Sequence, residues 1–372
     1  MTQGMVVLVN GSLAESLVNF RANLISSLVA RGHQVHVSAP GISPEVRARL
    51  DQLGALSHQV RLARTGLNPL ADLRYYRDLR WLIKEIGADF VLSYTAKPNI
   101  WGSLAAARSG VQSASMVTGL GFGFIDGVGL KRWLVQQVQH RLYALATKRN
   151  SAVIFQNPDD ERDFIAAGCL RDPAKARLVN GSGVDTGSFA PEPLPSGPRF
   201  LMIARLLASK GVREYVAAAH LVRAERPDCD FALAGFLDPG PDGISAEELA
   251  QWQAKGIRYL GQLDDVRPAI ADASVYVLPS YREGTPRTVL EAMAMARPVI
   301  TTDAPGCRET VVDGVNGLLV PCRDSAALAD AMRRLAADPS LRQAMGAAGR
   351  QRATARYSVE EVSAATIVAL SL

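Results

Sequence analysis

Short apolar runs alternate along the chain with longer amphipathic segments, which is typical of α/β architecture with parallel sheets. In the first half, apolar runs predict strands at 5–10, 33–39, 89–94, 113–118 and 151–156. Helical periodicity between these runs predicts helices over 16–31, 73–86 and 130–148. A second series of apolar runs predicts strands at 199–204, 230–235, 257–261, 274–280 and 298–303.

A segment dense in proline and glycine, "FAPEPLPSGPR" at 189–199, separates the two series of strands. Such a segment is typical of a linker between domains. We therefore expect an α/β protein of two doubly wound Rossmann-like domains, at 1–188 and 198–354. The final helical pattern, within 355–372, can pack on either domain. Open parallel sheets bind ligands beyond the carboxyl ends of their strands, so two such sheets facing each other would hold a ligand in the cleft between them.

The amino-acid composition restricts which ligands and which cellular compartment fit the chain. The 372 residues carry a net charge of +5, which favours anionic ligands such as phosphates or acidic lipids but falls short of a nucleic-acid footprint. The four cysteines lack the spacing of a zinc site or a disulfide framework, and we expect inert thiols in a reducing compartment. With no signal-peptide pattern and no apolar stretch of ~18 residues, the sequence predicts a cytoplasmic protein, or one attached peripherally to the inner face of the membrane.

Two glutamates, Glu283 and Glu291, follow the predicted strand at 274–280 with seven residues between them. Pro286 is suited to the first position of a helix, which places Glu283 in the preceding loop and Glu291 inside the helix. The helix start offers free backbone N–H groups for phosphate, and carboxylates accept hydrogen bonds from sugar hydroxyls. This layout fits a nucleotide sugar held at both ends.

Other interpretations of the pair remain open. An isolated E-x7-E arises often by chance, with Glu283 as a loop charge and Glu291 as an ordinary helix-face residue. Two carboxylates several ångströms apart also occur in glycoside hydrolases.

Cations and glycines follow other predicted strands. Arg205 comes just after the strand at 199–204 and Lys210 precedes a helical pattern, so together they could clamp a diphosphate. They are equally compatible with solvated surface charges. After the first strand, Gly11 and Ser12 offer close approach of the backbone to phosphate, although a glycine at such a place is more often only a turn.

Several motifs together resemble family-four glycosyltransferases of the GT-B fold. They are "LVARGHQVHV", "IARLLASKG", "NGSGVDTGSF" and "PSYREGTPRTVLEAMAMARPVITTDAPGCRETVVDGVNGLLV". "RTGLNPLADL", "VTGLGFGFID" and "MIARLLASKGVREY" further resemble the PglA-type members, which add N-acetylgalactosamine to an undecaprenyl-diphosphate-linked bacillosamine derivative.

The resemblance implies a retaining hexosyltransferase with a UDP-sugar donor, no cofactor and no metal. It assigns the donor diphosphate to Arg205 and Lys210, the donor sugar to Glu283 and the ribose to Glu291, with Leu263 near the base. The catalytic residues it implies are Arg205, Lys210 and Glu283. Residues lining the phosphate and sugar site are Gly284, Thr285 and Pro286, and Gly11 joins the donor-binding set.

On the acceptor side, the chain departs from many relatives, which carry a histidine near the position of Thr118. Its absence leaves a route in which the leaving phosphate helps to deprotonate the acceptor. Loops after first-domain strands supply the candidate acceptor residues, which are Ser12, Tyr94, Lys97, Thr118 and Gly119. The resemblance implies a lipid-linked sugar as acceptor.

The segment 130–149 combines an apolar stripe at Leu130, Leu134, Val138 and Leu142 with flanking cations. It could rest on an anionic bilayer, but we expect a core-facing helix with a solvated basic side.

Two other classes of protein remain as alternatives to such a transferase. A sugar-nucleotide epimerase of the GT-B fold would share the cleft but lack the flanks of the E-x7-E motif, and release of UDP only with acceptor present would exclude it. A non-catalytic nucleotide-sugar-binding module would bind without turnover, and the lack of G-x-G-x-x-G argues against a dinucleotide module. A transferase could also use a soluble acceptor.

Overall fold

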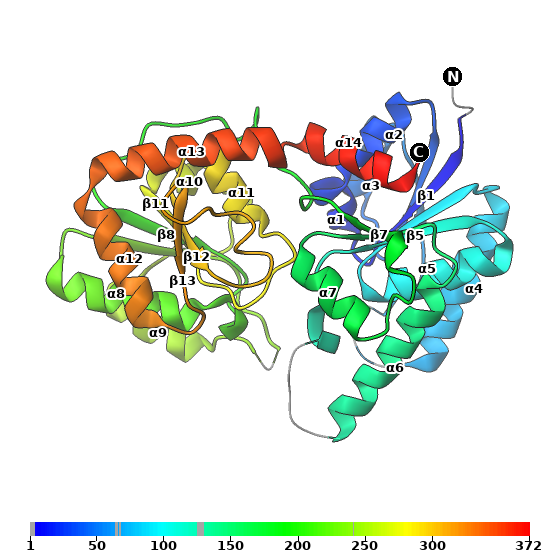
Figure 1. Ribbon diagram of the computed structural model, residues 1–372, viewed down its shortest axis with the longest axis horizontal. Helices are drawn as coiled ribbons and strands as arrows, with labels where there is room; N and C mark the ends of the chain where they lie inside the picture. The colour runs from blue at the N-terminus through cyan, green and yellow to red at the C-terminus, as the bar shows by residue number, and fades with distance from the viewer. Residues whose placement is uncertain (1–3, 64–65, 67, 125–129, 241) are drawn as a thin grey trace. The chain divides into compact units, whose positions relative to one another are not determined.

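The computed structural model describes residues 4–63, 66, 68–124, 130–240 and 242–372 (Figure 1). The chain forms two compact units. The first consists of Met1–Ser182 with Val359–Leu372, and the second of Gly183–Ser358. The chain therefore passes into the second unit before the proline-rich segment at 189–199.

The first unit is built on a seven-stranded sheet in the order β3-β2-β1-β4-β5-β6-β7. Every neighbouring pair is parallel, which is the doubly wound arrangement. The central strands are buried, as the apolar runs in the sequence require. The strands are β1 (Val6–Asn10), β2 (Gln34–Ala39), β3 (Leu56–Gln59), β4 (Phe90–Tyr94), β5 (Gln112–Val117), β6 (Ala152–Phe155) and β7 (Ala176–Leu178).

Helices follow most of these strands in the sequence and cover the sheet (Figure 1). The helix α5 packs against both α4 and α6, and the last helix, α14, belongs to this unit and packs against α2 and β6. The helices are α1 (Ala14–Phe20), α2 (Ala22–Ala30), α3 (Pro44–Gln52), α4 (Pro69–Glu85), α5 (Ala96–Ser109), the 3-10 helix η1 (Gly121–Phe124), α6 (Leu130–Thr147), α7 (Pro158–Ala166), the 3-10 helix η2 (Pro173–Lys175) and α14 (Val359–Leu370).

The single helix predicted at 16–31 is wrong, because the structure has two helices that meet at Arg21. This residue leaves helical geometry, with φ −123° and ψ −2°. Arg21 is 4% exposed, and its guanidinium lies 4.8 Å from the ring centre of Tyr94 and donates to Ser182 Oγ at 2.9 Å. Local periodicity cannot reveal contacts of this kind, because they join residues far apart in the sequence.

The second unit is built on six parallel strands in the order β10-β9-β8-β11-β12-β13. Its strands are β8 (Arg199–Ile203), β9 (Asp230–Ala234), β10 (Arg258–Tyr259), β11 (Val275–Leu278), β12 (Val299–Thr302) and β13 (Gly317–Val320). Its helices are the 3-10 helix η3 (Ala208–Lys210), α8 (Val212–Glu225), α9 (Ala246–Ala254), α10 (Arg267–Asp272), α11 (Arg287–Ala294), α12 (Ser325–Ala337) and α13 (Pro339–Tyr357). The two parallel sheets confirm the predicted fold class.

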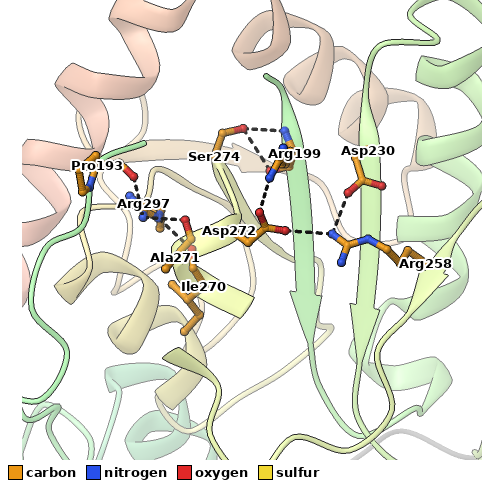
Figure 2. A network of polar contacts seen from close by, with 9 residues as sticks. All are labelled: Pro193, Arg199, Asp230, Arg258, Ile270, Ala271, Asp272, Ser274 and Arg297. Atoms are coloured by element: carbon orange, nitrogen blue, oxygen red, sulfur yellow. Dashed lines mark hydrogen bonds and ion pairs between the residues drawn. The ribbon is translucent and has the colours of Figure 1, made fainter. Parts of the chain in front are cut away.

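At the amino ends of β8, β9 and β10, charged side chains pair with one another (Figure 2). Asp272 binds both Arg199 and Arg258, and Arg258 also donates to Asp230 at 2.8 Å. Parallel strands have all their carboxyl ends at the opposite edge of the sheet, where ligands bind. This network therefore belongs to the structure of the sheet, and the ligand-binding edge is the opposite one.

The proline-rich segment at 189–199 is held against the second unit by Arg297, whose side chain is fully buried. Its guanidinium donates to the carbonyls of Pro193, Ile270 and Ala271 at 2.9–3.2 Å (Figure 2). It also donates to the carbonyl of Glu192 at 2.8 Å. Burial lowers the pKa of Arg297 to about 10. The segment predicted as a linker is therefore tied to the body of this unit.

Candidate functional site

Two loops at the carboxyl edge of the second sheet join closely: the loop after β8 and the loop after β11. Tyr281 N–H donates to the carbonyl of Ser209 at 2.9 Å. Gly211 has φ +72°, and a Cβ there would lie 2.1 Å from the carbonyl oxygen of Pro279. Only glycine meets both requirements, because it tolerates positive φ and has no side chain. The glycine thus allows the loop after β8 to approach the loop after β11.

This approach brings together two of the residues predicted from the sequence, Lys210 and Glu283. Lys210 Nζ donates to Glu283 Oε1 at 2.5 Å, and the two side chains are only 19% and 15% exposed. Two oppositely charged groups in a partly desolvated loop cluster attract each other more strongly than they would on an open surface. The second unit therefore carries a pre-formed ammonium–carboxylate pair next to the start of α11.

A third loop, which follows β12, supports the Glu283 segment from behind. Glu283 N–H donates to the carbonyl of Pro305 at 2.9 Å. At Gly306, φ is +80°, and a Cβ would lie 2.1 Å from the carbonyl oxygen of Glu283 and 2.6 Å from that of Gly284. Gly306 is not among the residues predicted from the sequence, although it stands within the motif that carries the resemblance.

The second glutamate, Glu291, lies inside α11 as predicted, in the turn after the helix start. The helix begins one residue later than expected, at Arg287, and Pro286 is its N-cap. Glu291 is 6% exposed and accepts a hydrogen bond from Arg287 Nε at 2.8 Å. Burial raises the pKa of Glu291, whereas the Arg287 guanidinium opposes the rise. Arg287 therefore helps to keep a buried carboxylate ionised. The nearby predicted residues Gly284 and Thr285 lie between β11 and α11, beside Glu283.

Arg205 follows β8 and keeps a half-exposed side chain. Its Nη1 lies 3.4 Å from the carboxylate of Asp238, in the loop after β9. The same loop holds the backbone near Lys210, because Asp242 accepts from Ser209 N–H at 3.0 Å and from its hydroxyl. Asp238 and Asp242 are not predicted from the sequence, because their contacts join loops that are far apart in the chain.

The loop after β10 carries Leu263, which is partly buried against the core of the second unit. Gly261 accepts a hydrogen bond from Gly235 N–H at 2.8 Å, which ties this loop to the end of β9. Burial is the main cause that raises the pKa of Glu291, and the charge of Asp265, farther along the same loop, adds to the rise.

In the first unit, Gly11 and Tyr94 pack directly on each other at the ends of β1 and β4. A Cβ on Gly11 would lie 2.3 Å from the Tyr94 hydroxyl oxygen. Tyr94 is 2% exposed, and its hydroxyl shares a 2.7 Å hydrogen bond with Ser16 Oγ. Burial raises the pKa of Tyr94. These contacts fit a role for Tyr94 in positioning the loop that carries Gly11.

The remaining first-unit candidates lie after β1, β4 and β5, which are neighbours in the sheet. Thr95 donates to Ser12 Oγ at 2.9 Å and has the unusual backbone angles φ 70° and ψ 160°. Lys97 forms a 2.8 Å ion pair with the buried Asp72. Thr118 and Gly119 directly follow β5, and both are partly exposed. The positive φ of Thr95 costs roughly 1–3 kcal/mol, because Thr95 is not a glycine, and backbone strain of this kind clusters at functional sites.

All four cysteines of the chain are free thiols. Three of the four free cysteines are buried, and Cys322 is exposed. Burial raises the pKa of Cys307, which lies under the loop after β11, to about 12. Among the residues that the structure describes, no group of three His, Cys, Asp or Glu side chains could hold a metal ion.

The loops of the second unit combine the groups that a polyhydroxylated, phosphorylated ligand requires. Carboxylates accept from hydroxyl groups, cations bind phosphate oxygens, and the N–H groups at the start of α11 add positive potential. The first unit offers hydroxyls and an ammonium group at the corresponding edge of its own sheet.

Comparisons with known proteins agree with this chemistry. The family model described as "Glycosyl transferase 4-like domain" matches residues 18–181, and "Glycosyl transferases group 1" matches 197–338. The chain is 30% identical to the N,N'-diacetylbacillosaminyl-diphospho-undecaprenol alpha-1,3-N-acetylgalactosaminyltransferase of Campylobacter jejuni, over 88% of each protein.

Solved structures share the fold of the whole chain. Anabaena HepE, crystallised in complex with UDP, has a TM-score of 0.79 at 19% identity and covers 99% of this chain and 100% of its own. Sucrose-phosphate synthase from Thermosynechococcus elongatus also has a TM-score of 0.79 at 19% identity, with 97% of each chain covered. The solved structures confirm the predicted GT-B fold. The two family models and the relative in Campylobacter jejuni confirm the predicted family, so the chain belongs to the group 1, family-four-like glycosyltransferases.

Proposed function

We propose that this glycosyltransferase moves an N-acetylhexosamine from a UDP-sugar to a polyprenyl-diphosphate-linked saccharide, with retention of anomeric configuration. The reaction would serve surface polysaccharide or glycan assembly at the cytoplasmic face of the membrane. The relative in Campylobacter jejuni is named for an N-acetylgalactosaminyl transfer to an undecaprenol-diphosphate-linked sugar, and HepE was crystallised with UDP. The observation that carries the proposal is the Lys210–Glu283 pair beside the start of α11.

In this proposal the donor lies along the loops after β8 and β11. Arg205 and Lys210 bind the diphosphate, Glu283 accepts from hydroxyls of the donor sugar, and Glu291 accepts from the ribose. An ammonium group has three N–H donors, so Lys210 can keep Glu283 and still bind a phosphate oxygen. Backbone groups at Gly284, Thr285 and Pro286 line the same place, and Leu263 lies near the base. Gly11, in the first unit, is also proposed as a donor-binding residue.

The chemical step requires stabilisation of the leaving UDP. Negative charge grows on its terminal phosphate as the glycosidic bond breaks, and cations already in place stabilise that charge without reorganising. The departing phosphate oxygen can take the proton of the acceptor hydroxyl, so the route needs neither a protein base nor a cofactor or metal. On the acceptor side, Ser12, Lys97, Thr118 and Gly119 are the candidate contacts, with Tyr94 as a positioning residue.

A donor panel with purified protein tests the proposal. UDP-N-acetylglucosamine and UDP-N-acetylgalactosamine are each incubated with lipid acceptors extracted from membranes, and products are identified by mass spectrometry. We expect a hexosamine added to a lipid-linked saccharide only in the complete mixture. Hydrolysis or epimerisation of the donor without any acceptor product would contradict the proposal.

A single substitution tests the role of Glu283. The variant Glu283→Gln should lower turnover far more than UDP affinity, because UDP lacks the sugar that Glu283 is proposed to contact. Loss of UDP affinity with turnover intact would refute the assignment.

A further inference from the structure

The helix α6 exposes large apolar side chains, contrary to the expectation of a core-facing stripe. Leu134 and Val138, two members of that stripe, are 50% and 52% exposed, and Trp133 and Leu145 are 53% and 59% exposed. The buried face of α6 consists instead of Tyr143, Ala146 and Thr147, on its C-terminal half. The prediction is therefore wrong for Leu134 and Val138, whereas Leu142 is partly buried against the core and the side chain of Leu130 lies outside the described residues. The covered side of α6 is set by α5 and α7, where Tyr143 packs edge-on against Phe164 of α7.

The charges of this segment are all of one sign. From 130 to 149 the sequence contains five cations and no aspartate or glutamate. Arg141, Lys148 and Arg149 are exposed, like the apolar residues. Residues three or four apart lie on the same side of a helix, so Leu134, Val138, Arg141 and Leu145 form one continuous strip on α6. Lys148 and Arg149 follow in the turn after the helix ends at Thr147. The exposed residues of this part of the helix and of the turn form the α6 face, which comprises Trp133, Leu134, Val138, Arg141, Leu145, Lys148 and Arg149.

An apolar face with cations and no acids fits the surface of an anionic bilayer. Leucine and valine side chains enter the boundary between headgroups and acyl chains, tryptophan is favoured at that depth, and lysine and arginine bind lipid phosphates. A second copy of the chain fits less well, because a two-fold contact would bring identical cationic faces together with no acid to pair them. Within the described part of the chain, no helix combines the length and apolar character needed to cross a membrane.

The α6 face is linked to the acceptor-side loop. The short helix η1 follows Thr118 and Gly119 and packs against α6, with the Phe124 and His140 rings 4.7 Å apart. In Figure 1 the first turns of α6 extend beyond the other helices of the unit. A membrane held by α6 would therefore lie close to the loop that follows β5.

We infer that the α6 face is a docking surface for an anionic lipid bilayer. Trp133, Leu134, Val138 and Leu145 enter the headgroup boundary, while Arg141, Lys148 and Arg149 bind lipid phosphates. The inference rests on the proposed function for its role, since docking would present the acceptor-side loop to a lipid-linked saccharide. The docking itself requires neither donor nor acceptor.

Vesicle co-sedimentation of the full chain tests the inference. We expect binding to phosphatidylcholine vesicles that contain phosphatidylglycerol, little binding to phosphatidylcholine alone, and weaker binding as salt increases. The double variant Trp133→Ser/Leu134→Ser should bind anionic vesicles on the order of tenfold more weakly. Arg141→Ser and Lys148→Ser should each weaken binding about fivefold, the equivalent of about 1 kcal/mol per cation near the surface.

A matched control lies on α4 of the same unit, where Trp81 and Leu70 are 64% and 70% exposed. Unlike α6, this helix carries acidic residues, including Asp72 and Asp78. The variant Trp81→Ser/Leu70→Ser should leave vesicle binding unchanged. Every variant should retain UDP affinity, because UDP affinity reports on the second unit. Measuring UDP affinity beside vesicle binding therefore separates a failure of docking from a failure of the proposed function.

Three outcomes would overturn the inference. The first is absence of binding by the wild-type chain to anionic vesicles. The second is a loss of binding in the α4 variant with none in the α6 variants. The third is a wild-type dimer, seen by light scattering, that the Trp133→Ser/Leu134→Ser variant converts to a monomer, because the face would then belong to a second copy.

Discussion

The pairing of Arg287 with Glu291 gives a quantitative test of the donor site. Glu291 is 6% exposed and its partner Arg287 keeps 31% of its side chain exposed, with 2.8 Å between Nε and Oε1. Two charges about 4 Å apart attract by roughly 4 kcal/mol at an effective dielectric constant near 20. Partial solvent access at Arg287 reduces this, and we take about 2 kcal/mol as the guanidinium's support of the carboxylate.

The variant Arg287→Gln removes this charge and keeps a hydrogen-bond donor. Because the ionised carboxylate is the stronger acceptor for ribose hydroxyls, UDP affinity should fall up to about thirtyfold, the equivalent of 2 kcal/mol. The loss should grow as pH falls, since burial already raises the pKa of Glu291 and the variant raises it further. Glu291→Gln should bind UDP weakly and without this pH dependence.

Calorimetric titration of UDP from about pH 5 to about pH 8 measures these changes. The matched control is Arg333→Gln in the same unit. Arg333 is also 31% exposed, but its partner Glu225 is 59% exposed, and the variant should leave UDP affinity unaltered. An Arg287→Gln protein with wild-type affinity and pH profile would refute the reasoning.

The sign of the stability effect follows from the same pKa. A carboxyl whose folded-state pKa is raised favours folding most when protonated. The free energy of unfolding should therefore fall as pH rises from the ordinary value near 4.5 through the raised pKa of Glu291. Urea titrations should show this fall in the wild type and its absence in Glu291→Gln.

Three further substitutions test separate parts of the second unit. Gly306→Ala should lower donor affinity at least tenfold, because the new Cβ pushes the carbonyl of Glu283 aside. Gly314→Ala, at similar φ but with open space around it, should cost only the backbone strain of about 1 kcal/mol in a thermal unfolding assay. If the two variants had equal effects, the close approach at Gly306 would be contradicted. Lys210→Met should reduce turnover on the order of a hundredfold in a UDP-release assay, and full turnover would assign the ion pair to structure alone. Arg297→Ala should lower the free energy of unfolding by about 3 kcal/mol in urea while UDP binding persists, and an unchanged midpoint would show that its four carbonyl contacts contribute little.

The sequence was informative where local pattern decides structure. The ten strands it predicts are all present, and most of them are buried parallel strands, which appear as uninterrupted apolar runs. It missed β3, β7 and β13, each of which lies at an edge of its sheet. These strands are only three or four residues long, and β3 and β7 are partly exposed. Their strand geometry depends on pairing with a partner, which periodicity does not record.

The candidate site also separates residues that a local pattern reveals from residues that depend on tertiary contacts. Residue type and motif spacing, together with the family resemblance, singled out Lys210, Glu283 and Glu291 as candidates. Asp238 and Gly306 could not be found this way, because their contacts arise only when loops from distant strands meet at one edge of the sheet. The exposure of Trp133 and its neighbours was also beyond the pattern, since an apolar stripe does not say which side another helix covers.

The most direct test of the central claim is transfer of labelled sugar from a UDP-N-acetylhexosamine to a purified polyprenyl-diphosphate-linked saccharide, followed by mass spectrometry of the lipid product. The account predicts a lipid lengthened by one hexosamine in the wild type and a severe loss of that product in Glu283→Gln. An unmodified lipid with the wild-type enzyme across both donors, or full product formation by Glu283→Gln, would contradict it.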